Sequence, residues 1–382
     1  MSNKQLHILI IGMTPNKGGT ETFSMNLFYG IREKYPDIKV TFLNIWDKDI
    51  AYQEEIIQSG GFVLHYKMPT GIKNIFFGYK MAKQLFSENE FDVVHVNANY
   101  LLPSYFAIGA KKSGVNRVIF HSHNSSYGNR SVLKKTFLEI ISIVQRQCLK
   151  KNSIILLAAS NEAGCWMFKR LKYMVISNGV NVDNFLFDNA KRQAVRNNLH
   201  ISNKSKIIIS VARMEYQKNH EKIILIFNEL SKLDNYYLIL VGTGSQEKKI
   251  KATILELGLA TRVKILGSRK DISELLMASD LMIMPSRYEG LPFSAIEAQA
   301  SGLSLVVSSE AFDKEVNIIN KITYLSNNDG DQKWAQTINK IIDLNMLSDR
   351  TKDNILVTKS KYSFEVTLKE VIPYYFDENE IS

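Results

Sequence analysis

Short apolar runs alternate with helical patterns along the whole chain, and this alternation limits the fold more than any other feature of the sequence. The runs are HILIIG, KVTFLNI, FVLHY, DVVHVN, RVIFHS and IILLAAS, followed by MVIS, KSKIIISVA, YYLILVG, VKILG, LMIMP and LSLVVSS. Runs of this kind, rich in Val and Ile and separated by helices, are typical of parallel sheets that helices cover on both faces. About six runs in each half predict an α/β fold with two doubly wound domains.

The boundary between the two domains is predicted in SNGVNVDNF, where Asn178 and Gly179 favour a turn and the helical pattern lapses. Residues 1–176 then form an N-terminal Rossmann-like domain and residues 177–360 a C-terminal one, each long enough to bury its own core. The tail KYSFEVTLKEVIPYYF predicts a final helix that is interrupted at Pro373.

The positive charge of the chain is concentrated in its first half. Of the formal net charge of +10, residues 1–170 carry +9, from 21 Lys and Arg against 12 Asp and Glu. This asymmetry favours an anionic partner for that half: a membrane surface, a phosphorylated ligand or nucleic acid. The two cysteines lack metal-ligand spacing and no apolar run reaches the roughly 18 residues of a membrane span, so a cytoplasmic location is predicted.

Two glutamates eight residues apart, Glu289 and Glu297, lie in the stretch SRYEGLPFSAIEAQASG. The preceding run predicts a strand that ends at Pro285, and the Gly-Leu-Pro loop delays the next helix to about Phe293. Glu289 is therefore expected in a loop at the carboxyl edge of a parallel strand, where open α/β sheets bind ligands, and Glu297 in the first turns of the helix. Carboxylates there can accept hydrogen bonds from sugar hydroxyls, and the helix start offers N–H groups to an anion. Two glutamates around such a loop favour this function over two solvated surface charges.

Further candidate ligand-binding residues follow two other predicted strands. Arg213 and Lys218 come after KSKIIISVA, and their charged groups suit a diphosphate at the same sheet edge. By themselves these two would be interpreted as surface charges. The stretch GTGSQE begins like a dinucleotide-binding fingerprint but has Glu247 in place of the third glycine, so we interpret Gly242 and Gly244 as glycines that let the backbone approach a ligand.

In the first half, MTPNKGGTETF links the first strand to a helix through Gly18 and Gly19. This loop can approach a phosphate closely, and a purely structural turn explains it equally well. His121 and His123 lie at the carboxyl end of another strand and are expected to reach a cleft between the domains. We expect their rings on opposite faces of the strand, one functional and one packed, in preference to a shared metal ion.

Together these positions resemble family 4 of the GT-B glycosyltransferases, the retaining nucleotide-sugar transferases. The resemblance covers nearly the whole chain and is strongest from SNGVNVDNF to EGLPFSAIEAQASG. It implies that Glu289, the first glutamate of the family's E-x7-E pair, faces the transferred sugar, and that Glu297 holds the nucleotide ribose. It also implies that His123 acts beside Glu289 as the catalytic histidine, with His121 and Asn124 as acceptor-side candidates. The residues expected to bind the nucleotide-sugar donor are Arg213, Lys218, Glu297, Gly290, Leu291, Phe293, Gly242, Gly244, Gly18 and Gly19.

The resemblance also implies that the two domains have different ligands. Residues 177–360 would bind the donor and residues 1–176 the acceptor, with the last helix, at 361–382, crossing back to the first domain. GT-B enzymes need no metal ion, and the D-x-D triplets at 47–49 and 329–331 lie away from the predicted ligand edges, so no metal and no cofactor are expected. The expected activity is retaining transfer of a sugar from a nucleotide diphosphate, expected to be UDP, to a lipid-diphosphate-linked glycan. Similar enzymes build bacterial capsule or exopolysaccharide at the cytoplasmic membrane.

The stretch SVLKKTFLEIISIVQRQCLKK predicts an amphipathic helix over residues 131–150. We favour a core helix with a solvated basic face over a helix that lies on an anionic membrane, so peripheral membrane contact is the second interpretation. The apolar stripe consists of Leu133, Phe137, Ile140, Ile141, Val144 and Cys148.

Two alternative functions remain open on the sequence. A nucleotide-sugar epimerase of the same architecture would need no acceptor. A basic nucleic-acid-binding protein would explain the charge of the first half, but the chain has no recognisable reading motif and no aromatic residues interleaved with its basic ones. Nucleic acid is therefore not an expected partner.

Overall fold

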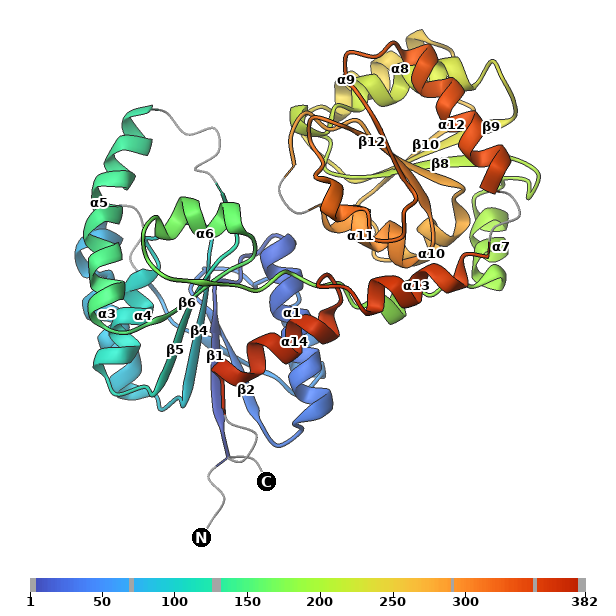
Figure 1. Ribbon diagram of the computed structural model, residues 1–382. Coiled ribbons are helices and arrows are strands. Elements are labelled where there is room, and N and C mark those ends of the chain that lie inside the picture. The colour runs from blue at the N-terminus through green and yellow to red at the C-terminus, as the bar shows by residue number, and fades with distance from the viewer. Residues whose placement is uncertain (1–4, 69–71, 126–131, 290–291, 346–348, 377–382) are drawn as a thin grey trace. The chain divides into compact units, whose positions relative to one another are not determined.

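The computed structural model describes residues 5–68, 72–125, 132–289, 292–345 and 349–376 (Figure 1). The chain divides into two compact units. Unit 1 consists of residues 1–179 and 364–382, and unit 2 of residues 180–363. The predicted domain boundaries lie a few residues earlier in the sequence, and the ligands predicted for each domain stay predictions.

Unit 1 is built on a seven-stranded parallel sheet with the strand order β3-β2-β1-β4-β5-β6-β7. The strands are β1 (His7–Ile11), β2 (Lys39–Asn44), β3 (Phe62–His65), β4 (Val93–Ala98), β5 (Arg117–Ser122), β6 (Ile155–Ala158) and β7 (Met174–Val175). The helices are α1 (Gly19–Lys34), α2 (Gln53–Gln58), α3 (Ile72–Glu88), α4 (Ser104–Lys112), α5 (Val132–Lys151), α6 (Asn161–Phe168) and α14 (Phe364–Val371), and a 3-10 turn, Ile372–Tyr374, follows α14.

Alternating side chains of each strand place one hydrophobic core on each face of this sheet. On β1, Ile8 and Ile10 pack with α1, α2 and α14, whereas Leu9 and Ile11 pack with α3, α4, α5 and α6. The last helix therefore belongs to unit 1, where it lies beside α1 (Figure 1). There Gly30 makes room, because a side chain at this position would collide with Leu368 of α14.

Unit 2 repeats this architecture around a six-stranded parallel sheet with the order β10-β9-β8-β11-β12-β13. The strands are β8 (Lys206–Val211), β9 (Tyr236–Val241), β10 (Val263–Gly267), β11 (Leu281–Met284), β12 (Ser304–Ser308) and β13 (Ile322–Leu325). The α-helices are α7 (Asn189–Asn198), α8 (His220–Leu230), α9 (Glu247–Glu256), α10 (Ile272–Ala278), α11 (Phe293–Ala300), α12 (Asp331–Asn345) and α13 (Thr351–Thr358), and 3-10 turns lie at Val182–Phe185, Tyr216–Lys218 and Lys314–Val316. One core joins α8, α9 and α12 to the sheet, and the other joins α10, α11 and α13 to its opposite face.

The predicted fold class, two parallel-sheet α/β domains, is confirmed, with two differences in the strands. The run MVIS, counted with the second half, contributes the two-residue strand β7, which pairs with β6 in unit 1. Strand β13 was missed because its residues, ITYL, are only partly buried at the sheet edge and do not form a continuous apolar run.

In each sheet the strand order reverses once, between β1 and β4 in unit 1 and between β8 and β11 in unit 2. Open α/β sheets bind ligands outside the carboxyl ends of the strands at such a reversal. The loops that follow β8 and β11 contain the predicted donor-binding residue Lys218 and the predicted catalytic residue Glu289, and the loop after β1 contains Gly18.

Candidate functional site

The loops after β8 and β11 are bonded to each other at the strand reversal of unit 2. Gln217 accepts a hydrogen bond at its carbonyl oxygen from the N–H of Arg287 (2.8 Å), and its side-chain amide donates to the carbonyl oxygen of Tyr288 (2.9 Å). Next to it, the Lys218 ammonium lies 2.7 Å from both carboxylate oxygens of Glu289. The structure thus joins two residues that the sequence placed only at the same sheet edge.

This ion pair is largely withdrawn from solvent. The side chain of Glu289 is 3% exposed and that of Lys218 is 16% exposed. A pair at this depth is screened far less than a surface pair, and removal of one partner would leave an uncompensated charge. Lys218 therefore fixes the position of the Glu289 carboxylate.

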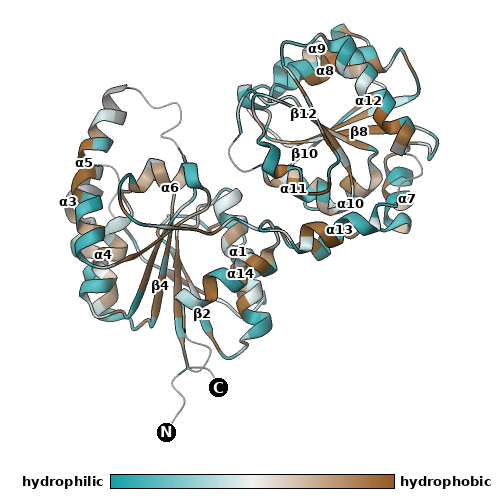
Figure 2. Cartoon of the chain, in the orientation of Figure 1, coloured by the Kyte–Doolittle hydropathy of each residue, from teal (hydrophilic) through white to brown (hydrophobic). Residues whose placement is uncertain are grey.

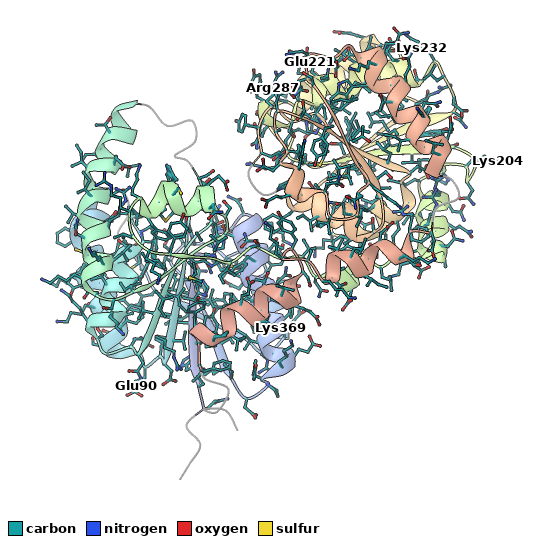
Figure 3. All side chains as sticks on the ribbon, in the orientation of Figure 1. Glu90, Lys204, Glu221, Lys232, Arg287 and Lys369 are labelled. Atoms are coloured by element: carbon teal, nitrogen blue, oxygen red, sulfur yellow. The ribbon has the colours of Figure 1, made fainter. Side chains whose placement is uncertain are left out.

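The same two loops also hold a cation stacked on an aromatic ring. The guanidinium of Arg287, labelled in Figure 3, lies 4.3 Å from the ring centroid of Tyr216 and donates to the side-chain oxygen of Asn219 (2.9 Å). Arg213, which follows β8, has an exposed side chain. Its predicted contact with a diphosphate stays a prediction.

Gly242 and Gly244 let the loops after β9 and β8 pack together. Gly242 has φ +131°, and a side chain there would overlap the carbonyl oxygen of Ala212. A side chain at Gly244 would overlap the carbonyl oxygen of Met214, whose N–H donates to Thr243 (2.9 Å). The close approach that these glycines permit in the structure is between two stretches of backbone, and their predicted contact with a ligand stays a prediction.

Glu297 lies in the second turn of α11 and is partly buried. Its carboxylate has no hydrogen-bond or ion-pair partner among the described residues, and burial raises its pKa to about 7. Phe293, at the start of α11, packs against the core on this side of the sheet. Gly290 and Leu291, also predicted to bind the donor, lie outside the described residues.

A pocket lies between α8 and α9, and its lining includes Tyr216, His220 and Arg287. It lies on the α8 side of the sheet, opposite the core that contains α11. None of the predicted donor-binding residues that the structure describes lines it.

In unit 1, the loop before α1 is closed by Glu21. The carboxylate of this buried residue accepts hydrogen bonds from the N–H (3.2 Å) and the hydroxyl (2.7 Å) of Thr14. Gly18 precedes α1 in an extended conformation, and Gly19 is the first helical residue. A side chain at Gly18 would approach the Glu21 carboxylate within 2.9 Å. A glycine is therefore favoured here for the shape of the turn alone, without any bound ligand. A phosphate contact of Gly18 and Gly19 stays a prediction.

His121 and His123 lie on the same face of the sheet, so the prediction of opposite faces was wrong. Side chains of a strand alternate with a period of two, which places residues 121 and 123 on one side. Their ring centroids are 4.2 Å apart, and Phe23 of α1 packs against both. Both rings therefore belong to one cluster.

The ring of His123 is held by two asparagines that the sequence analysis did not place at the site. Its Nε2 lies 2.7 Å from the side-chain oxygen of Asn97, and its Nδ1 lies 3.3 Å from the side-chain nitrogen of Asn178. Nε2 therefore donates to Asn97, and Nδ1 accepts from Asn178. Burial lowers the pKa of His123 to about 3, so the neutral ring is present at physiological pH. The polar pair in the strand DVVHVN was the available signal for Asn97.

Asn124, an acceptor-side candidate, forms part of the turn after β5. Its carbonyl oxygen accepts from the Ser122 hydroxyl (3.4 Å), and its side-chain oxygen accepts from the N–H of Ser125 (3.0 Å). Over the described part of the chain, no three His, Cys, Asp or Glu side chains are arranged to hold a metal ion. The expectation of a metal-independent reaction stays a prediction.

Helix α5 exposes three residues of its predicted apolar stripe, Phe137, Ile140 and Val144, so the core interpretation was wrong for these three. Of the rest of the stripe, Ile141 and Cys148 are partly buried, and the side chain of Leu133 lies outside the described part of the chain. Phe137, Ile140, Ile143 and Val144 are 50%, 60%, 56% and 64% exposed. We call these four residues the α5 apolar face, and Figure 2 shows hydrophobic colour along this helix. The side of α5 that packs against the rest of unit 1 contains the buried Arg146. Its guanidinium donates to the carbonyl oxygen of Met167 (2.9 Å) and pairs with the carboxylate of Glu139 (3.0 Å). No helix in the described ranges is long and apolar enough to span a membrane.

Comparisons with known proteins find similarity to glycosyltransferases. Residues 191–356 match the family described as "Glycosyl transferases group 1". The chain is 29% identical over 345 residues to a Bacillus subtilis protein named as the glycosyltransferase EpsF, with 88% of each chain covered. It is 27% identical over 252 residues to the UDP-Gal:alpha-D-GlcNAc-diphosphoundecaprenol alpha-1,3-galactosyltransferase of Escherichia coli, with 62% of each chain covered.

Solved structures share the fold of the whole chain. HepE of Anabaena, determined in complex with UDP and glucose, aligns with a TM-score of 0.74 at 18% identity, covering 97% of this chain and 99% of its own. Its two parallel-sheet domains are those of the GT-B fold, which confirms the fold expected from the sequence.

Proposed function

We propose a specific reaction for this glycosyltransferase, in which residues 191–356 belong to the group 1 family and both units together have the GT-B fold. It transfers a sugar, with retention of configuration and without a metal ion, from UDP to a lipid-diphosphate-linked glycan of a bacterial capsule or exopolysaccharide. The observation that carries the proposal is the sheet edge of unit 2, where Lys218 holds Glu289 and the partly buried Glu297 follows on α11.

Each of these groups suits one part of a nucleotide sugar. Lys218 and Arg213 carry the positive charge that a diphosphate requires, and a charged hydrogen bond of this kind contributes roughly 1.5 to 3 kcal/mol. The carboxylate of Glu297, which has no partner among the described residues, can accept bonds from two ribose hydroxyls. The carboxylate of Glu289, buried beside Lys218, can stabilise positive charge at the anomeric carbon as the diphosphate departs. The ring of His123 stays neutral because its pKa lies far below physiological pH, and its Nδ1 can accept from a sugar hydroxyl in place of the Asn178 amide, which lies 3.3 Å away.

The relatives support UDP as the leaving group and a lipid-linked acceptor. The Escherichia coli relative is named for a UDP-linked donor and a diphosphoundecaprenol acceptor, and HepE was solved with UDP. The charge of +9 over residues 1–170 fits an anionic diphosphate acceptor bound by unit 1.

Release of UDP tests this reaction directly. The protein is incubated with a panel of UDP-sugars, with and without an undecaprenyl-diphosphate-linked sugar. Transfer requires that UDP and an elongated lipid appear only when the acceptor is present. Conversion of the donor into its epimer without acceptor would identify an epimerase, and binding to arbitrary DNA without UDP-sugar affinity would identify the nucleic-acid alternative.

The pKa of Glu297 predicts a pH-dependent affinity for UDP. Its carboxylate is ionised above about pH 7 and can then accept from both ribose hydroxyls, whereas the protonated form below that pH loses one acceptor. Between pH 6 and pH 8 the affinity of the wild type should rise more than that of Glu297→Gln, by up to about tenfold, because the ionised fraction changes by that factor. Titration calorimetry with UDP at both pH values measures the difference, and the variant corrects for ionisation of UDP itself. Parallel curves for the two proteins would exclude the ribose contact.

We also propose that the α5 apolar face docks on an anionic membrane, which would bring unit 1 to a lipid-linked acceptor. Four half-exposed apolar side chains on one helix form an unusual surface for a soluble domain, and the exposed Lys150 and Lys151 follow on the same helix. A positively charged unit complements anionic headgroups, and this complementarity favours a membrane over a second copy of the equally basic chain.

Removal of this face should weaken membrane binding by about tenfold or more. The variant replaces Phe137, Ile140 and Val144 by Ser, and each half-exposed side chain contributes on the order of 1 kcal/mol when a membrane covers it. Co-sedimentation with vesicles of phosphatidylglycerol and phosphatidylcholine measures the effect, which should also shrink as salt screens the charges. The control replaces three exposed apolar residues of unit 2, Leu233, Leu255 and Leu344. Absence of binding by the wild type, or conversion from dimer to monomer by the variant, would contradict the membrane as partner.

A further inference from the structure

Behind His123, unit 1 contains a buried chain of polar groups that the proposed reaction does not use. The Tyr375 hydroxyl lies 2.5 Å from Nδ1 of His95, and Nε2 of His95 lies 3.2 Å from Nδ1 of His121. All three side chains are fully buried. Tyr375 follows α14, so these hydrogen bonds link the C-terminal segment to the central strands β4 and β5.

The sheet register explains why these rings meet. β4 and β5 are neighbours, with His95 beside Ile119 and Asn97 beside His121. Residues 95 and 97 share the face of β4 that carries Val93, and this face packs with α1 and α14. Two polar pairs are therefore set side by side in an apolar core: His95 with His121, and Asn97 with His123.

This series of hydrogen bonds ends at His121, whose ring packs against the ring of His123. Nε2 of His121 is buried without a hydrogen-bond partner among the described residues, and the two ring centroids are 4.2 Å apart. A buried polar atom without a partner is unfavourable, and an apolar ring of similar size would avoid it. The structure nevertheless places the imidazole of His121 in contact with the ring of His123, which the proposed reaction uses.

We propose that Tyr375 is a positioning residue for His123: its hydroxyl fixes the hydrogen positions of His95 and His121, and the fixed His121 ring supports His123. This inference rests on the proposed function only in giving His123 a role in transfer. The C-terminal segment is then part of the catalytic machinery of unit 1 as well as of its core.

The positions of the N–H hydrogens on His95 and His121 are coupled, because each neutral ring carries only one N–H. Burial lowers the pKa of His95 to about 3 and that of His121 well below its usual value, so both rings are neutral at physiological pH. If the Tyr375 hydroxyl donates to His95, both rings carry their hydrogen on Nε2. If the hydroxyl accepts, both rings carry it on Nδ1. Either way, His95 and His121 must have the same tautomer, and the hydroxyl selects which one.

Tyr375→Phe removes only the hydroxyl and tests the coupling without an activity assay. Nitrogen-15 NMR of histidine side chains in the full-length protein reports the tautomer of each ring. The wild type should show one tautomer, shared by His95 and His121, and Tyr375→Phe should show a mixture for both and a shifted His123 signal. Tyr374→Phe, one residue away on the same segment, is the matched control and should leave all three rings unchanged.

The kinetic consequence separates positioning from folding. Tyr375→Phe should lower kcat of transfer by about tenfold with little change in the KM for the UDP-sugar, as expected when a reacting group is displaced but the donor site is intact. His121→Phe keeps an aromatic ring at this position, removes the hydrogen bond to His95 and should have the same effect. Unchanged His121 and His123 signals in Tyr375→Phe would overturn the proposal. Full activity of His123→Ala would instead refute the role of His123 in the proposed function, and the NMR result would still decide whether Tyr375 positions that ring.

Discussion

Glu289→Gln is expected to bind the UDP-sugar with nearly wild-type affinity and to lose about 100-fold or more of its kcat. The amide has the shape of the carboxylate, and its oxygen can still accept a hydrogen bond from Lys218, which lies 2.7 Å from Glu289 in the wild type. The negative charge is lost, however, and with it the stabilisation of positive charge at the anomeric carbon. Removal of one such preorganised group typically costs about 10² to 10³ in rate.

The measurement is a transfer assay beside the affinity for the UDP-sugar and the melting temperature. Asp353→Asn is the matched control, because Asp353 also forms a partly buried ion pair in unit 2, with Lys321 at 2.6 Å, but far along the chain from the strand reversal. It should reduce stability without reducing kcat. Normal turnover by Glu289→Gln would mean that this glutamate does not face the reacting sugar.

The sheets, and with them the sheet edge at which we propose the site, could be predicted because they depend on local patterns. Val- and Ile-rich runs identify strands that are buried on both faces, and the residues directly after them lie at the carboxyl edge. The ion pair of Lys218 with Glu289 could not be predicted, because the two residues are separated by 71 positions and their contact depends on the conformation of two loops. The same holds for Tyr375 and His95, which are 280 positions apart.

Two errors have different physical origins. The shared face of His121 and His123 was available from the sequence, since the period of a strand is two, and the structure corrects a misapplied rule. For α5 the sequence shows an amphipathic helix but not which side packs on the domain. Arg146 can be buried there because Met167 and Glu139 satisfy its guanidinium, and these partners come from the tertiary structure.

Lys218→Met is expected to lower the free energy of unfolding of unit 2 by about 3 kcal/mol. The methionine retains most of the aliphatic stem but leaves the carboxylate of Glu289, only 3% exposed, without its cation. An uncompensated buried charge of this kind costs about 3 to 5 kcal/mol. By contrast, Lys249→Met removes the cation from Glu221 in a solvent-exposed pair and should cost less than about 1 kcal/mol.

The double variant Lys218→Met/Glu289→Gln distinguishes this cause from a simple loss of packing. If the unpaired charge is responsible, removal of that charge should restore most of the lost stability, and the interaction energy of the cycle should be large. Trp334 is fully buried in unit 2, whereas Trp46 and Trp166 belong to unit 1, so replacing those two by Phe leaves a fluorescence probe of unit 2 alone in urea unfolding. Additive losses in the two single variants would show that Lys218 stabilises the loop independently of Glu289. In that case Glu289 would owe its position to Gln217 and to the backbone of its own loop, and Lys218 would be free to serve a diphosphate without disturbing the carboxylate that faces the sugar.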